Sequence, residues 1–167
     1  GEGQKGLVIT DQTPFYAEGG GQVCDKGFMS TATEAGDDKI FDAEVIKVEK
    51  KDGIFYHTIQ VLANEIHVGD EVLLAVDPEK RYASARNHTA THLLQKALRE
   101  VVGSHVEQAG SMVNENVLRF DFSHFEAVSA AQLEEVERLV NEAIFASYPI
   151  VAEEMSIDAA REKGAMA

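Results

Sequence analysis

His88 and His92 lie four residues apart in the segment Asn87-His-Thr-Ala-Thr-His92. Side chains at this spacing share one face of an α-helix, so the two imidazoles could bind one zinc ion. Zinc usually takes three or four protein ligands, and the pair therefore predicts half of a site. A capping or core role is the alternative. Zinc-protease chemistry is disfavoured, because Thr89 stands where those enzymes place a glutamate base.

No obvious third ligand accompanies the pair. His57 and His67 fall in a region predicted to be β-structure, and His105 and His124 fall in or beside a predicted hairpin. We interpret these four histidines as ordinary surface or core residues. Cys24 is the single cysteine, so an internal disulfide is excluded, and we interpret it as a small buried side chain.

The second unusual segment carries Gly19, Gly20 and Gly21, followed directly by Gln22. Consecutive glycines let a backbone approach a ligand closely and expose its amide groups. The alternative is a flexible turn between strands. A phosphate-binding P-loop is excluded, because no lysine and hydroxyl pair follows the glycines.

The chain of 167 residues changes its pattern near residues 77–87. Before this point, alternating and β-branched runs separated by turn residues predict a small β-barrel. These runs are residues 41–48, which contain a slip after Val45, then 54–61 and 71–76, with turns at 51–53 and 68–70.

After this point, helical and strand-like patterns alternate. We predict a helix over 87–102 with Asn87 as its N-cap, a hairpin of strands 104–113 and 117–122, and a helix from Ser129 with Gln132 completing a capping box. A strand over 150–154 and a short helix capped by Ser156 follow. The expected fold is therefore α+β. A β-barrel subdomain (1–80) precedes a two-layer α/β subdomain (81–167), with helices on one face of a mainly antiparallel sheet.

The chain is strongly acidic, with a net charge of −14. Broad neutralisation of nucleic-acid phosphates needs a basic surface, so DNA binding is not expected and any RNA contact should be local. We interpret the few basic clusters, at residues 80–81, 86, 96 and 99, as solvated surface. No apolar run reaches the length of a membrane span and no signal peptide opens the chain, so we expect a cytoplasmic protein.

In combination, four segments resemble the editing region of the alanyl-tRNA synthetase family, in the family's order and spacing. The resemblance covers essentially the whole chain. A free-standing alanyl-tRNA editing protein shares most of these segments. Threonyl-tRNA synthetase shares the histidine pair on a related editing domain but not the Thr-Pro-Phe-Tyr-Ala-Glu segment. The segments are Thr13-Pro-Phe-Tyr-Ala-Glu18, Gly20-Gly-Gln22, Asn87-His-Thr-Ala-Thr-His92 and Leu118-Arg-Phe-Asp-Phe-Ser-His124.

The resemblance implies an editing hydrolase that serves protein biosynthesis. Members of the family hydrolyse the ester of tRNA(Ala) wrongly charged with serine or glycine. A separate editing site is needed because one methylene discriminates by only ~1–3 kcal/mol during binding. ATP and alanine would be used in an aminoacylation region outside this chain. A free-standing deacylase and a noncatalytic tRNA acceptor-binding module are the alternatives.

The resemblance also implies zinc, bound by His88 and His92 together with a later cysteine and histidine. Nothing in this chain matches those two ligands, so they are expected beyond Ala167. Separately, the ending Ala165-Met-Ala167 just after a predicted helix indicates a cut inside a longer protein. We therefore expect weak zinc binding and little deacylase activity from the isolated chain.

Three further residues match the family's editing pocket: Thr91, Gln108 and Ser111. Their amide and hydroxyl groups would recognise the serine hydroxyl or position a water, and zinc would orient the aminoacyl group or lower the pKa of a bound water toward ~7. The acceptor end of tRNA(Ala) would enter between the Gly19–Gln22 loop and the histidine helix. Without the resemblance, solvent-facing side chains are the simpler interpretation.

Overall fold

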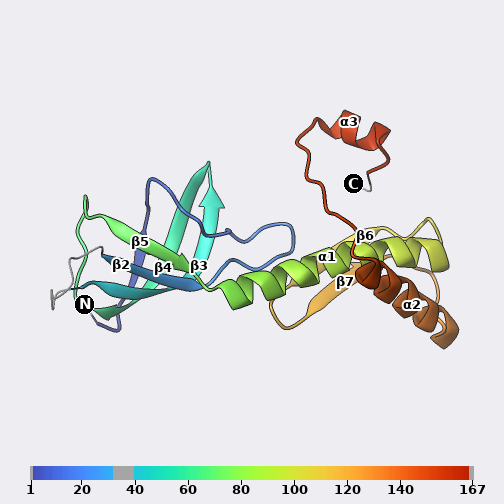
Figure 1. Ribbon diagram of the computed structural model, residues 1–167, viewed down its shortest axis with the longest axis horizontal. Coiled ribbons are helices and arrows are strands. Elements are labelled where there is room, and N and C mark those ends of the chain that lie inside the picture. The colour runs from blue at the N-terminus through green and yellow to red at the C-terminus, as the bar shows by residue number, and fades with distance from the viewer. Residues whose placement is uncertain (1, 32–39, 166–167) are drawn as a thin grey trace.

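A five-stranded antiparallel sheet, a two-stranded hairpin and three helices form the described part of the chain (Figure 1). The structure is a computed structural model that describes residues 2–31 and 40–165. Met166 and Ala167, which belong to the terminal segment considered above, lie outside the described residues. The predicted α+β class is confirmed.

The larger sheet has the strand order β1-β4-β3-β2-β5. A groove lined by residues 7–14 and 66–74 separates its two edge strands. No ladder joins β1 to β5 within the described residues, so closure of this sheet into a barrel stays a prediction. The strands are β1 (Lys5–Val8), β2 (Gly27–Thr31), β3 (Asp42–Lys51), β4 (Ile54–Ala63) and β5 (Val72–Val76).

Local sequence signals account for the central β3–β4 hairpin. Asp52 and Gly53 both have positive φ angles, 51° and 82°, as the predicted tight turn requires. The slip in alternation after Val45 is a register shift between Val45 and Lys47, which leaves Ile46 as the extra residue of a bulge. Because of this bulge, Val45 and Val48 both face the core and are fully buried.

Helix α1 (Pro78–Val101) is the longest element and connects the two halves of the structure (Figure 1). It begins nine residues before the predicted start, so the prediction of Asn87 as its N-cap is wrong. The Asp77 side chain accepts the Lys80 backbone N–H at 3.1 Å and Pro78 occupies the first turn, which together fix the start. His88 and His92 therefore lie in the middle of a continuous helix.

The predicted hairpin and second helix are confirmed, with shorter strands. They are β6 (Gln108–Val113), β7 (Leu118–Phe122) and α2 (Ala130–Ala146). Ser129 and Gln132 form both hydrogen bonds of the predicted capping box. A register shift between Gln108 and Gly110 bends β6 next to the candidate pocket residues.

Residues 150–154 form no strand, so that prediction is wrong. Ile150 and Val151 are 77% and 75% exposed, and the β-branched pair meets no neighbouring strand within the described residues. The segment leads instead to α3 (Ile157–Glu162), which Ser156 caps as predicted. No helix among the described residues is both long and apolar enough to cross a membrane.

Two apolar clusters stabilise the structure. The first lies within the five-stranded sheet and is built around Met29, Phe41 and Ile59. The second joins α1, α2 and the start of the hairpin through Leu98, Val136 and Val106. These clusters lie on either side of the predicted boundary near residue 80, and the division into subdomains 1–80 and 81–167 stays a prediction.

His57 is a fully buried polar residue of the first cluster's strand β4. Its Nδ1 lies 3.2 Å from the Val8 carbonyl oxygen. Because a carbonyl oxygen only accepts, Nδ1 must carry the proton and donate it. Nε2 then accepts the hydrogen bond from the Thr13 hydroxyl, at 2.8 Å. This arrangement uses the neutral imidazole. Burial lowers the pKa of His57 below its ordinary value of 6.5.

We predict that acidification destabilises the fold through His57. Because the folded-state pKa lies below 6.5, the unfolded chain binds the proton first. Stability is therefore complete above about pH 6.5 and falls as the pH drops, by up to about 1.4 kcal/mol per pH unit for one such group. Urea unfolding between pH 8 and pH 5 measures this slope.

The matched control is exposed His67, whose side chain is 70% accessible. His67→Gln should keep the wild-type slope and His57→Gln should flatten it. Equal slopes in both variants would contradict the assignment.

Candidate functional site

The two histidines of α1 present their imidazoles side by side. The ring centroids of His88 and His92 are 5.2 Å apart and the ring planes differ by 14°. His88 is half-buried, whereas His92 is exposed. The predicted common face is therefore confirmed, and the pair offers two neighbouring nitrogen donors at a surface that a ligand can reach.

The glycine segment contacts this pair directly through Gln22. The His88 Nδ1–H group donates to Gln22 Oε1 at 2.8 Å, and the Gln22 side chain is buried. Desolvation, with a smaller contribution from the charge of His92, lowers the pKa of His88. His88 is therefore a neutral imidazole at pH 7, which is the form that binds metals.

Gly21 brings the same segment against the hairpin. It has a φ of 79°, and a Cβ atom added there would lie 2.2 Å from Ser111 Oγ. Ser111 Oγ in turn accepts a hydrogen bond from Gln108 Nε2 at 3.0 Å. Two of the three predicted pocket residues, Gln108 and Ser111, are thus in mutual contact and lie beside the glycine loop that holds Gln22.

Thr91 is placed differently from the other two. It is buried, and its hydroxyl donates to the Asn87 carbonyl oxygen one turn earlier at 2.8 Å. Asn87 itself donates to the Asn114 carbonyl oxygen at 2.8 Å, which attaches α1 to the β6–β7 turn. No recorded contact joins Thr91 to Gln108 or Ser111, and its catalytic role stays a prediction.

The glycine loop is a tight, ordered turn. Gly19 and Gln22 exchange two backbone hydrogen bonds, of 3.1 and 3.0 Å, and Gly20 stands between them with a φ of 57°. Tyr16 closes the loop by donating its hydroxyl to the Gly19 carbonyl oxygen at 2.9 Å. The glycines allow the turn, because two consecutive positions adopt left-handed backbone angles.

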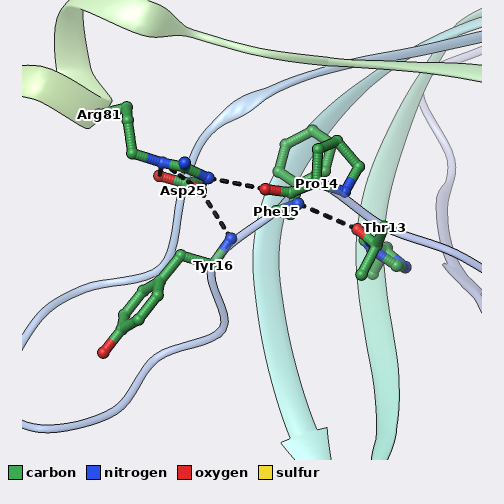
Figure 2. Close-up of polar contacts among 7 residues, drawn as sticks. Thr13, Pro14, Phe15, Tyr16, Asp25 and Arg81 are labelled. Carbon is green, nitrogen blue, oxygen red and sulfur yellow. Dashed lines mark hydrogen bonds and ion pairs between the residues drawn. The ribbon is translucent and has the colours of Figure 1, made fainter. Parts of the chain in front are cut away.

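A partly buried ion pair between Arg81 and Asp25 connects this segment to α1, and sequence reasoning missed it. Figure 2 shows the Arg81 side chain directed toward Asp25 and the Pro14 carbonyl oxygen. Arg81 Nε donates to both Asp25 carboxylate oxygens at 2.9 Å, and its Nη2 donates to Asp25 and, at 2.7 Å, to Pro14. Asp25 also accepts the Tyr16 backbone N–H at 2.6 Å. The interpretation of Arg81 as solvated surface is therefore wrong.

The Thr13–Glu18 segment acts through the same attachment. Phe15 is buried in the core of the sheet, Thr13 binds His57, and the Glu18 N–H donates to the Val48 carbonyl oxygen at 3.1 Å. Each of these contacts fixes backbone or packs apolar surface. Within the described residues, the segment anchors the glycine loop and the helix to the sheet.

The donor set fits two positions of a zinc site. Neutral imidazole nitrogens four residues apart suit Zn²⁺, and Gln22 supplies the hydrogen bond that such ligands usually make through their other nitrogen. No group of three or more histidine, cysteine, aspartate or glutamate side chains that could hold a metal occurs among the described residues. Cys24 is a buried free thiol and forms no metal-binding group with the two histidines.

Comparison with known proteins agrees with the motifs. Residues 1–80 match the family model of class II (A) tRNA synthetases. The chain is 47% identical over 167 residues to alanine–tRNA ligase of Desulfitobacterium hafniense (strain Y51), and 49% identical over 166 residues to that of Hydrogenovibrio crunogenus. This chain is homologous to one segment of alanine–tRNA ligases. The match covers 99% of the chain and 18% of each ligase.

Gln22, Asp25 and Arg81 all lie within the part of the chain that aligns with the alanine–tRNA ligases. The chain spans about 18% of the length of the curated ligases it matches, and the aligned part takes in the whole glycine loop and histidine helix. The similarity extends over the whole chain, and the activity of this chain is a separate question that depends on its site.

We predict that Gly21→Ala is more destabilising than Gly53→Ala. The two glycines have nearly equal φ angles, 79° and 82°, but Gly53 has no atom within 4 Å of the added Cβ. Both variants carry left-handed backbone strain of about 1–2 kcal/mol, and only Gly21→Ala must also displace Ser111, for about 1–3 kcal/mol more. Urea unfolding of both variants measures the difference. Equal losses would show that Gly21 does not lie against the hairpin.

We predict that Arg81→Met costs about 2–3 kcal/mol of unfolding free energy, because it leaves the buried Asp25 carboxylate without its charged partner. The matched control is Arg138→Met on α2, which breaks ion pairs with exposed Glu135 and Glu142 and should change little. Thermal and urea unfolding report both effects. A similar small effect for both arginines would contradict the structural role of Arg81.

Proposed function

We propose that this chain is an editing module of an alanine–tRNA ligase, which hydrolyses the ester of tRNA(Ala) mischarged with serine or glycine. The observation that carries the proposal is the convergence of three sequence-distant segments at one place. Gln22 of the glycine loop contacts His88 of α1, and Gly21 of the same loop lies against Ser111 of β6. All three segments belong to the region aligned with alanine–tRNA ligases.

The reaction consists of the attack of a water oxygen on the ester carbonyl carbon. The bond to the terminal ribose oxygen breaks, that oxygen takes up a proton, and free amino acid and tRNA are released. Gln108 and Ser111 are uncharged, so their task is to orient water or substrate by hydrogen bonding. Gln108 is exposed and Ser111 half-buried, so both are accessible to the end of a substrate.

The same two side chains offer a basis for selecting serine. An amide and a hydroxyl can hydrogen-bond the hydroxyl of a seryl group, whereas the methyl of a correctly attached alanyl group offers them no such contact. A hydrogen-bonding site gains this contact only with a substrate that carries the matching group, and it discriminates in that way against substrates that lack it.

His88 and His92 would hold zinc, together with ligands outside this chain. Bound there, zinc would supply Lewis-acid polarisation of the aminoacyl ester or orient it. The acceptor end of tRNA(Ala) would approach between the glycine loop and α1. ATP and alanine would be used elsewhere in the ligase, and a free-standing deacylase of the same superfamily remains the closest alternative.

The decisive test is the hydrolysis of seryl-tRNA(Ala) by the full-length protein. We expect Gln108→Ala to lower kcat/KM about 10- to 100-fold, the equivalent of one lost hydrogen bond at the reacting group. Gln60→Ala, on β4, is the matched control and should leave the rate unchanged. Gel-shift titration with tRNA(Ala) measures affinity in the same variants.

The outcomes separate catalysis from binding. Loss of hydrolysis with unchanged tRNA affinity supports the editing proposal. Loss of affinity with unchanged turnover of the bound substrate would favour a noncatalytic acceptor-binding module. The isolated chain should bind zinc weakly and hydrolyse seryl-tRNA slowly, and stoichiometric zinc with rapid turnover would contradict that expectation.

A further inference from the structure

The hydrogen bond between Gln22 and His88 determines where the imidazole proton lies. An amide oxygen only accepts, so the 2.8 Å contact with Gln22 Oε1 requires the proton to be on His88 Nδ1. A neutral imidazole with this proton keeps its lone pair on Nε2. Metal-binding histidines commonly donate their second N–H to an oxygen, which fixes both tautomer and ring orientation.

We propose that Gln22 is a positioning residue for metal binding, holding His88 in the tautomer whose Nε2 lone pair is free to bind a divalent cation beside His92. The inference deepens the proposed editing function and rests on it for the identity of the cation. In this proposal Gln22 orients His88 for metal binding, which differs from the expected role of the glycine loop in contacting the end of tRNA.

The backbone around Gln22 is fixed on two sides. Its N–H and C=O groups both bond to Gly19 across the turn. On the hairpin side, the neighbouring Val23 N–H donates to the Val113 carbonyl oxygen at 2.9 Å, and the Val113 N–H donates to Gly21 at 2.8 Å. Gln22 is 6% exposed. A side chain held this way can set the orientation of the ring it contacts.

The Asp25–Arg81 ion pair holds the segment in register with α1. Residues 81 and 88 are two helical turns apart, about 10.5 Å along the axis, and residues 22 and 25 in an extended chain span about 10 Å. The distance between residues 22 and 25 in an extended chain therefore nearly equals the distance between their partners, His88 and Arg81, along the helix. Sliding of the segment along α1 would break both contacts.

The tautomer is measured directly by the ¹⁵N chemical shifts of the imidazoles at pH 8, in uniformly labelled protein without added metal. His88→Gln assigns the His88 signals by their loss. The expected result is a protonated Nδ1 and an unprotonated Nε2 in the wild-type protein. A protonated Nε2 would mean that the Gln22 amide donates instead, and would overturn the inference without any variant.

Two substitutions test whether Gln22 is the cause. Gln22→Glu keeps an acceptor oxygen and should retain the wild-type tautomer, whereas Gln22→Leu removes it and should shift the equilibrium toward the Nε2–H form. Gln60→Leu is the matched control and should leave the His88 shifts unchanged. An unaltered tautomer in folded Gln22→Leu protein would overturn the inference. If that variant does not fold, the wild-type and Gln22→Glu spectra still decide.

The second readout is zinc affinity, from titration of Zn²⁺ followed on the imidazole signals of His88 and His92. Gln22→Leu should weaken binding about 10- to 100-fold relative to Gln60→Leu, as loss of such a supporting hydrogen bond does elsewhere. Equal affinities would overturn the inference. If zinc binding depends on Gln22 but the full-length protein hydrolyses no seryl-tRNA(Ala), the inference is supported and the editing proposal is rejected.

Discussion

The attachment of one short segment to one helix is the constraint on which the candidate site depends. Residues 13–25 run from the core of the five-stranded sheet to the surface of α1. Side-chain contacts hold them there: Arg81 with Asp25 and the Pro14 carbonyl oxygen, and His88 with Gln22. Asp25 has only 3% of its side chain exposed, so its charge is tolerable only because Arg81 and the Tyr16 N–H compensate it. The ion pair matters for the orientation of the sheet relative to the histidines, because the apolar clusters of the two halves share no residue and polar contacts have to join them.

The three consecutive glycines have a structural role in this attachment. Glycine-rich loops are often flexible or bind ligands, yet here three consecutive glycines make an ordered turn. Gly19 exchanges two backbone hydrogen bonds with Gln22, and the Gly21 carbonyl oxygen accepts the Val113 N–H. Their function is steric: the absence of a Cβ at Gly21 lets the loop reach Ser111, and the same turn aims Gln22 at α1. The loop therefore joins the hairpin to the helix, and the candidate site exists where the three meet.

The sequence predicted those features whose signals are local. The β3–β4 turn, the bulge after Val45 and the capping box of α2 each arise from residues within a few positions of one another. The start of α1 was missed although Asp77-Pro78 is a strong helix-starting pair, because the apolar stripe begins only at Leu93 and the first half of the helix is polar.

The contacts that build the site were not predictable in this way: Gln22 lies 66 positions from His88, and Asp25 lies 56 from Arg81. The family resemblance pointed to Gln22 and His88 but not to Asp25 or Arg81, and it could not say which residues touch.

The charge distribution argues for a division between chemistry and affinity. The chain carries a net charge of −14, whereas the converging side chains Gln22, Gln108 and Ser111 are uncharged and His88 is neutral at pH 7. An acidic surface attracts cations and repels phosphates, so it favours a metal at the histidine pair and opposes tight binding of RNA. If the site edits tRNA, most of the binding free energy must come from basic surface outside these 167 residues, and that agrees with a chain spanning 18% of the ligases it matches. The module would then contribute selectivity at the aminoacyl end, where neutral hydrogen-bonding groups distinguish a hydroxyl from a methyl better than any charge could.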